Sequence, residues 1–118
     1  MKTIQIADIT LREVANQSAA ALSFKERIEL ARSLDRLHVD RIELPPISDG
    51  READVLTNKT IASVVASAAV MASVGMSEDS VTEAWESVKA AKAPALQVLM
   101  PVSAIQMEYL CHKKGPAV

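Results

Sequence analysis

The sequence is poor in aromatic residues, glycine and cysteine. Phe, Trp and Tyr together make up 3% of the 118 residues, so a platform on which nucleic-acid bases could stack is not expected. The three glycines are far apart in the chain and form no glycine-rich phosphate loop. The single cysteine, Cys111, excludes a disulfide within the chain and predicts a reducing, cytoplasmic setting.

Long apolar runs and an excess of one charge are absent as well. The most apolar stretch, residues 61–74, is interrupted by serines and is shorter than the roughly 20 residues that a membrane-spanning helix needs. The formal net charge is −2 and the basic residues are scattered. Neither nucleic acid nor a membrane is therefore an expected partner.

What the chain does contain is an alternation of short apolar strands and amphipathic helices. The third and fourth strands are apolar on both faces, which predicts an α/β fold with a parallel sheet covered by helices. The length allows one hydrophobic core, in a single domain over residues 1–118. Strands are predicted at residues 3–10, 41–44, 69–74 and 96–102, helices at 23–37, 51–67 and 80–92, and a loop or further helix from 103.

Local signals mark several element ends. Ser23 and Glu26 have the spacing of a capping box at the start of the first helix. Pro45 and Pro46 are expected to end the second strand and Pro94 to end the third helix. The predicted apolar faces consist of Phe24, Ile28, Ala31, Leu34 and Leu37 in the first helix, and of Val81, Ala84, Trp85 and Val88 in the third.

Polar residues follow the predicted strands at their carboxyl ends, where function gathers in parallel α/β folds. Asp8, Arg12 and Glu13 lie after the first strand, and Glu43 lies near the end of the second. A carboxylate there can bind a hard divalent cation, and a guanidinium can clamp a carboxylate or stabilise an oxyanion. The candidate loci are residues 8–17, 43–49, 73–79 and 101–106.

Structural roles also explain the same residues, and composition and spacing alone favour them. Arg12 and Glu13 could form a solvated ion pair, which contributes little to stability. Glu43 could likewise pair with Arg41 or with Arg12. His38, between the first helix and the second strand, is expected at the opposite, structural end of the sheet.

Residues 8–17, Asp-Ile-Thr-Leu-Arg-Glu-Val-Ala-Asn-Gln, resemble the motif Asp-x-Thr-Leu-Arg-(Asp/Glu)-Gly-x-Gln. That motif opens a family of metal-dependent acyl-CoA condensing and cleaving enzymes, which includes isopropylmalate, homocitrate and citramalate synthases and HMG-CoA lyase. The likeness continues through residues 23–40, the Ile-Glu strand at 41–44 and a Ser-x-x-His-like segment at 103–109. It therefore covers nearly the whole chain.

The resemblance implies a fold and a reaction. The fold would be the amino-terminal half of a (β/α)₈ TIM barrel, with about four parallel strands and covering helices, since a whole barrel takes roughly 250 residues. The reaction would be a Claisen-type condensation of acetyl-CoA with a small 2-oxo acid, as in 2-isopropylmalate and homocitrate synthases of amino-acid biosynthesis. Mg²⁺, Mn²⁺ or Zn²⁺ would be the Lewis acid. The 118-residue chain alone is expected to be inactive.

The resemblance also implies residue roles. Glu13 would be a ligand of the divalent metal. Arg12 would polarise the carbonyl of the 2-oxo acid and stabilise the oxyanion that forms on attack. The other implied site residues are Glu43 as a second catalytic residue, Gln17 and Ser103 as substrate contacts, and Asp8 as a supporting carboxylate.

The chain departs from the family pattern at several positions. Val14 stands where the family has Gly, and Pro45-Pro46 follow the strand-two Glu. Gln106 occupies the family's His position, and His38 replaces the common Gly before strand two. The chain also has no His-x-His pair, which the family's metal site takes from strand seven. The identity of the 2-oxo acid and of the metal is therefore left open.

Two other functions stay open beside the synthase. One is a lyase of the same family that cleaves a carbon–carbon bond, as HMG-CoA lyase does. The other is a non-catalytic half-barrel that acts as an interaction or regulatory protein. Four strands of an unclosed sheet leave two open edges, which predicts a homodimer or self-association through them.

Overall fold

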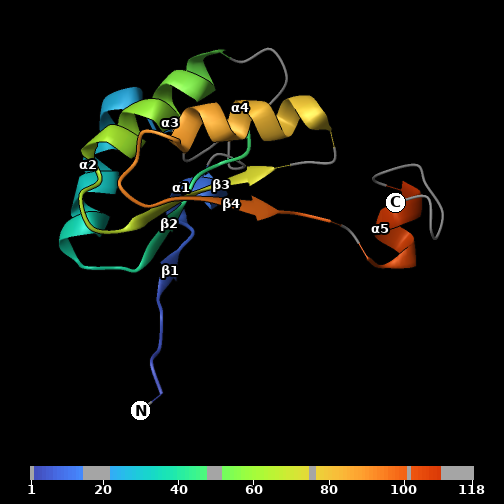
Figure 1. The fold of residues 1–118 in the computed structure, drawn as a ribbon, viewed down its shortest axis with the longest axis horizontal. Helices are drawn as coiled ribbons and strands as arrows, with labels where there is room; N and C mark the ends of the chain where they lie inside the picture. The colour runs from blue at the N-terminus through green and yellow to red at the C-terminus, as the bar shows by residue number, and fades with distance from the viewer. Residues whose placement is uncertain (1, 15–21, 48–51, 75–76, 101, 110–118) are drawn as a thin grey trace.

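The computed structural model describes residues 2–14, 22–47, 52–74, 77–100 and 102–109. Strands and helices alternate through these residues, as Figure 1 shows. No helix in them is long and apolar enough to cross a membrane. The elements are β1 (Ala7–Asp8), α1 (Thr10–Val14), α2 (Phe24–Arg36), β2 (Arg41–Glu43), α3 (Glu52–Val64), β3 (Ala69–Val74), α4 (Glu78–Val88), β4 (Pro94–Val98) and α5 (Ala104–Tyr109).

The described strands form one parallel sheet in the order β1-β2-β3-β4, so each strand pairs with the next one along the chain. The register places Asp8 beside Ile42, and Glu43 beside Met71. Helices α2, α3 and α4 lie together on one side of this sheet (Figure 1). The expected α/β fold with four parallel strands and covering helices is confirmed.

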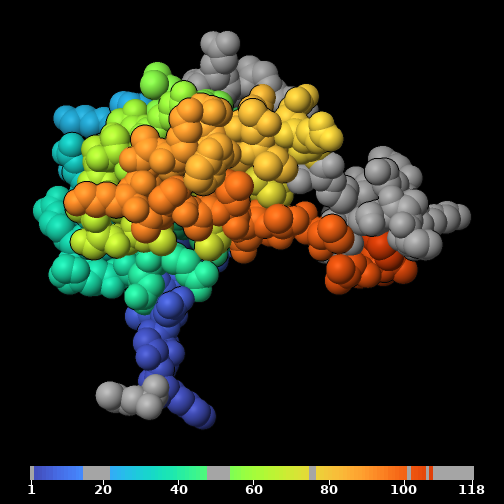
Figure 2. Space-filling model, viewed as in Figure 1, coloured from blue at the N-terminus to red at the C-terminus, as the bar shows by residue number. Residues whose placement is uncertain are grey.

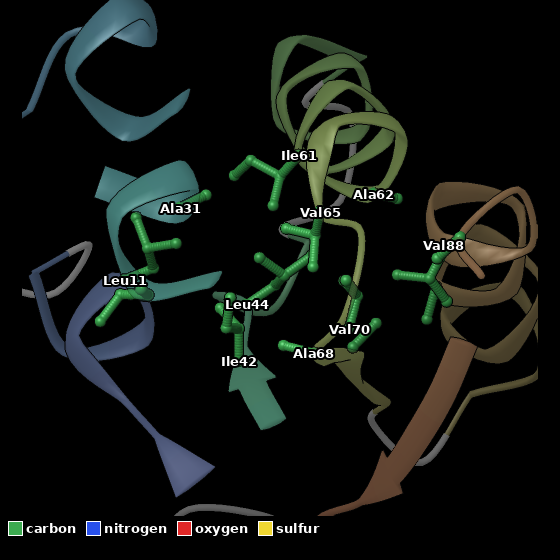
Figure 3. Close-up of a cluster of buried hydrophobic side chains, with 14 of the residues drawn as sticks. Leu11, Ala31, Ile42, Leu44, Ile61, Ala62, Val65, Ala68, Val70 and Val88 are labelled. Atoms are coloured by element: carbon green, nitrogen blue, oxygen red, sulfur yellow. The ribbon is translucent and has the colours of Figure 1, made fainter. Parts of the chain in front are cut away.

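The hydrophobic core lies between the sheet and these helices. Ile42 and Val70 in the sheet, and Ile61 and Val88 on the helices, are almost completely buried there (Figure 3). Burying an aliphatic side chain of this size stabilises the fold by about 1.5–3 kcal/mol. Because side chains alternate along a strand, the intervening residues of β2 and β3 face the side of the sheet away from the helices. These intervening residues are Arg41, Glu43, Met71 and Ser73.

Helix α2 begins as the capping box predicts. Glu26 N–H donates to Ser23 Oγ at 3.2 Å, and Ser23 N–H donates to Glu26 Oε2 at 2.8 Å. The middle of the predicted apolar face is buried, but Phe24 and Leu37 at its two ends are exposed. The prediction of a continuous buried stripe was therefore wrong at both ends.

In helix α4, too, part of the predicted apolar face is exposed. Ala84 and Val88 are buried against the sheet, whereas Val81 and Trp85 are 43% and 44% exposed. Pro94 does not end this helix, because α4 ends at Val88, and Pro94 is instead the first residue of β4. Proline is tolerated in that position, where the strand has not yet begun to donate to its neighbour.

The first strand is shorter than predicted, and the residues that follow it are helical. Residues 3–6 lie outside β1, and the segment after it, predicted as a loop from Arg12, begins with α1. The carboxylate of Asp8 explains the early turn, since its Oδ1 accepts from Thr10 N–H at 2.9 Å and its Oδ2 accepts from Thr10 Oγ1 at 3.1 Å. Such a local hydrogen bond competes with an extended strand.

Two aspartates join elements at the amino ends of the strands. Asp35, in the last turn of α2, accepts hydrogen bonds from the N–H groups of residues 66–68, between α3 and β3, at 2.9 to 3.0 Å. Asp40 Oδ2 accepts from Ile6 N–H at 2.6 Å, and its carbonyl accepts from Ala69 N–H at 2.9 Å. These bonds hold β1, β2, β3 and α2 in register at this end.

His38 has a left-handed backbone conformation, with φ of 61°. It follows Leu37, the C-cap residue of α2, and its N–H donates to the carbonyl of Asp35 at 3.1 Å. A residue just past a helix end commonly takes this conformation, and glycine is favoured there because it has no Cβ. The structure therefore gives a physical reason for the Gly of the family pattern at this position.

Replacing Asp35 with asparagine tests the link between α2 and the turn before β3. Burial raises the pKa of the Asp35 carboxyl group, but the N–H groups of Ala66, Ala68 and Ser67 and the nearby His38 lower it more. Its pKa therefore lies below the ordinary 3.8. The ionised carboxylate stabilises the fold at neutral pH, and this contribution is lost as pH falls below that value.

We expect Asp35→Asn to lower the free energy of unfolding by about 1 kcal/mol at pH 7, because three hydrogen bonds to a charged acceptor are weakened. The difference from the unmodified protein should shrink in denaturation curves measured at acid pH. Glu29→Gln, on the exposed face of the same helix, serves as the control and should change little. An equal loss at both pH values would contradict the assignment.

We expect His38→Gly to raise the free energy of unfolding by about 1 kcal/mol. The left-handed conformation costs a residue with a Cβ about 1–2 kcal/mol, and the greater freedom of glycine in the unfolded chain offsets part of the gain. His38→Ala keeps the Cβ and should give no comparable gain. Chemical denaturation of the three proteins measures the difference, and equal stabilities of the glycine and alanine variants would refute the strain argument.

Candidate functional site at the carboxyl ends of the first strands

The short helix α1 carries the residues that the sequence singles out. It follows β1 directly, and Leu11 anchors it in the core with 3% of its surface exposed. The next two side chains, Arg12 and Glu13, therefore lie close to the end of β2, where Glu43 is the last residue of the strand. Glu43 is itself buried, with 8% of its surface exposed.

One guanidinium contacts both carboxylates. Arg12 Nη1 donates to Glu43 Oε2 at 2.5 Å, while Nε and Nη2 donate to Glu13 Oε1 at 3.2 and 3.1 Å. The side chain of Glu43 is 11% exposed and that of Glu13 is 48% exposed. The structure thus brings together three of the predicted site residues at one rim of the sheet.

The two ion pairs differ in how much they contribute to the stability of the fold. The pair with the half-exposed Glu13 is worth little, because water competes for both charges. The pair with Glu43 matters more, since a carboxylate withdrawn from water is costly unless a cation compensates it. Of the two partners that the sequence left open for Glu43, the structure selects Arg12. Arg41 instead donates through Nη2 to Gln5 Oε1 at 3.2 Å.

Arg12 has N–H donors that these hydrogen bonds do not use. A guanidinium carries five N–H donors, and the hydrogen bonds described here use three of them. The side chain is also 24% exposed. It can therefore hold Glu43 and still donate to a carbonyl or carboxylate oxygen that approaches from outside the sheet.

The structure does not place the remaining predicted site residues in contact with Arg12. Asp8 lies at the end of β1, but both of its oxygens bond to Thr10, so its role is to shape the turn into α1. Ser103 precedes α5, which lies apart from the sheet (Figure 1). Gln17 lies outside the described residues. The substrate contacts inferred for Gln17 and Ser103 therefore stay predictions.

The described carboxylates do not fit a complete metal site. Across the described part of the chain, no group of three or more His, Cys, Asp or Glu residues is placed to hold a metal ion. The oxygens of Asp8 are engaged with Thr10, and Glu13 and Glu43 are both engaged with Arg12. Glu13 thus stays a predicted metal ligand, without a second ligand beside it in these residues.

Sequence reasoning missed one polar group on the same face of the sheet. Gln97 lies inside β4, a strand predicted from its apolar character. Ser73 was named only as the first residue of the candidate locus 73–79. The structure pairs these two residues on neighbouring strands. The available signal was the two-residue period of β4, which separates Gln97 from the flanking Leu96 and Val98.

A double-mutant cycle tests the Arg12–Glu43 pair. Arg12→Met leaves the Glu43 carboxylate without its cation, and we expect the free energy of unfolding to fall by about 2–3 kcal/mol. Adding Glu43→Gln removes the uncompensated charge and should recover about half of the loss. Adding Glu13→Gln instead is the matched control, and it should recover almost nothing because Glu13 is half exposed. Equal recovery by both would show that Glu43 is not the principal partner.

Comparisons with known proteins agree with this arrangement. The family model described as HMGL-like matches residues 3–118. The chain is 34% identical over 115 residues to 2-isopropylmalate synthase of Bacillus cytotoxicus, which covers 97% of the chain and 22% of that protein. The 2-isopropylmalate synthase of Halalkalibacterium halodurans is 33% identical over 111 residues, 92% of the chain and 21% of that protein.

The chain thus spans about a fifth of the length of the curated relatives that it matches. The 2-isopropylmalate synthase of Bacillus cereus gives the same coverage, 97% of the chain and 22% of the relative. The four parallel strands with intervening helices are what part of a barrel of this family contains. With the family model matching nearly every residue, the chain belongs to the HMGL-like family.

Proposed function

We propose that residues 1–118 are the amino-terminal half of the catalytic barrel of a 2-isopropylmalate synthase-like acyltransferase. The relatives with this name support the choice of a synthase over a lyase. The observation that carries the proposal is the position of Arg12, partly exposed at the rim and held by the buried Glu43. Alone, the chain would lack the rest of the barrel and would be inactive.

The proposed reaction joins acetyl-CoA to a small 2-oxo acid. A base takes a proton from the methyl carbon of acetyl-CoA, and this carbon attacks the ketone carbon as the C=O π bond opens to an oxyanion. The oxyanion then takes up a proton. Hydrolysis of the thioester by water then releases free CoA. Arg12 would donate its remaining N–H groups to the ketone oxygen and would bind it more strongly as negative charge develops.

Glu43 would act through Arg12. Its carboxylate fixes the guanidinium through Nη1, and two N–H donors remain beyond those that Glu43 and Glu13 use. A preorganised donor of this kind needs no rearrangement when charge forms, which is why its loss typically costs a factor of about 10²–10³ in rate. Acetyl-CoA and a divalent metal belong to the proposal by resemblance to the family, and a cytoplasmic setting belongs to it because the chain has a single cysteine. No step above depends on the metal.

The test uses the protein that carries this chain at its native length. With acetyl-CoA and a suitable 2-oxo acid it should release free thiol, and Arg12→Ala should reduce the rate about 10²–10³-fold because an oxyanion donor is lost. Arg32→Ala, on the exposed face of α2, is the control and should leave the rate unchanged. No thiol release with any common 2-oxo acid would contradict a synthase, and activity only in the cleavage direction would indicate the lyase.

Self-association through the open sheet edges is part of the proposal for the 118-residue chain. The residues before β1 and after β4 extend from the body of the molecule (Figure 2). Apolar side chains are exposed along both, with Ile4 at 85% and Val102 at 81%, and Val98 at the end of β4 is 66% exposed. β1 and β4 each have one unpaired edge in the described sheet. A second copy could cover these edges, as the rest of a barrel would.

Size-exclusion chromatography with light scattering tests this self-association. The 118-residue chain should run as a dimer or larger species at tens of micromolar. Val98→Lys puts a charge on the edge strand and should shift the chain toward monomer. Leu56→Lys, equally exposed on α3 at 60%, should not shift it. A clean monomer of the unmodified chain would refute the proposal.

A further inference from the structure

Two polar atoms on the side of the sheet away from the helices are buried without a hydrogen-bond partner. They are the hydroxyl oxygen of Ser73 and the amide oxygen Oε1 of Gln97. Ser73 is 5% exposed, so bulk solvent contacts little of its side chain. A buried polar atom without a partner destabilises the fold, and such atoms are rare in native proteins. Their retention needs an explanation.

The register brings these two residues together. Ser73 of β3 pairs with Gln97 of β4 in the parallel sheet, so both side chains leave the same face. Val70, Ala72 and Val74 of β3 face the helices and belong to the hydrophobic core. Ser73 therefore lies on the opposite face, two residues beyond Met71, and the same face carries Glu43 of β2.

The pair lies at the reactive end of the sheet. Met71 pairs with Glu43, so Ser73 lies one layer farther toward the carboxyl ends of the strands than the carboxylate that holds Arg12. A third buried atom without a partner, Nε of Arg41, lies at the other end, because Arg41 pairs with Ala69 at the start of β3. It is thus separated from the pair along the strands.

The chemistry of the pair selects what can approach it. The amide oxygen of Gln97 only accepts hydrogen bonds, and the hydroxyl of Ser73 can accept or donate one. A hydroxyl or other donor group on a ligand can satisfy both oxygens. An alkyl group of the same size would leave both buried oxygens unsatisfied, and sites of this kind reject such analogues strongly.

We infer that Ser73 and Gln97 bind the side chain of the substrate and select a 2-oxo acid that bears a hydroxyl or another hydrogen-bond-donating group over its alkyl counterpart. This inference rests on the proposed function, since it places the ketone at Arg12 and the side chain of the same molecule at β3 and β4. Ser73 and Gln97 determine specificity and take no part in bond making.

Binding of two isosteric 2-oxo acids tests the inference in the protein at its native length. The probes are 4-hydroxy-2-oxobutanoate and 2-oxopentanoate, which differ by a hydroxyl in place of a methyl group. Isothermal titration without acetyl-CoA measures their dissociation constants without any turnover. The unmodified protein should bind the hydroxylated acid at least about tenfold more tightly, because only that acid satisfies the two oxygens.

Variants assign the preference to the pair. Ser73→Ala and Gln97→Met should each remove most of the preference for the hydroxylated acid while leaving the affinity for 2-oxopentanoate equal or higher. Ser73→Thr keeps the hydroxyl and should keep the preference, which also controls for damage to the fold. Ser33→Ala, on the exposed face of α2, should behave as the unmodified protein.

Equal binding of the two acids by the unmodified protein would overturn the inference, as would an unchanged preference in Ser73→Ala and Gln97→Met. Either result would mean that the two oxygens are satisfied by a bound water molecule or by residues from elsewhere in the protein. Discrimination in binding without release of CoA would support the side-chain site and count against the condensation, so the two proposals fail separately.

Discussion

The burial of one face of the sheet against α2, α3 and α4 is the constraint on which the rest of the structure depends. Ile42, Val70 and their neighbours fill this interface, and strand geometry then sends every alternate side chain to the opposite face. Glu43, Met71 and Ser73 lie on that second face because their neighbours along each strand point into the core. The polar residues of the candidate site are thus placed by hydrophobic packing on the other side of the sheet.

The two ends of the sheet carry different kinds of polar interaction. At the amino ends, Asp35 and Asp40 accept backbone N–H groups from distant segments and hold the strands in register. These carboxylates bond to backbone groups of the fold itself, so we assign them to stability. At the carboxyl ends, the contacts are between side chains, and Arg12 keeps donors beyond those that Glu43 and Glu13 use. This contrast follows the division between stability and function that parallel α/β folds show.

The family pattern and the local structure also explain one another. His38 stands at a position with a left-handed backbone, which accounts for the glycine of the pattern. The Asp-x-Thr part of the opening motif works locally, because Asp8 bonds to Thr10 and starts α1. The Leu of the motif anchors α1 in the core, and the Arg that follows reaches β2. Asp8, Thr10 and Leu11 therefore each have a physical role in presenting Arg12, whatever the substrate.

The sequence by itself determined the alternation of strands and helices, the start of α2 and the family, because these depend on local periodicity, capping and a contiguous motif. It also located Arg12, Glu13 and Glu43 at strand ends. Only the tertiary structure decided that Glu43 pairs with Arg12, and that Ser73 lies beside Gln97. Those contacts join residues far apart in the chain, and they depend on the order and register of the strands. Side-chain periodicity shows which residues share a face of one strand, but it does not show which residue of the next strand lies beside them.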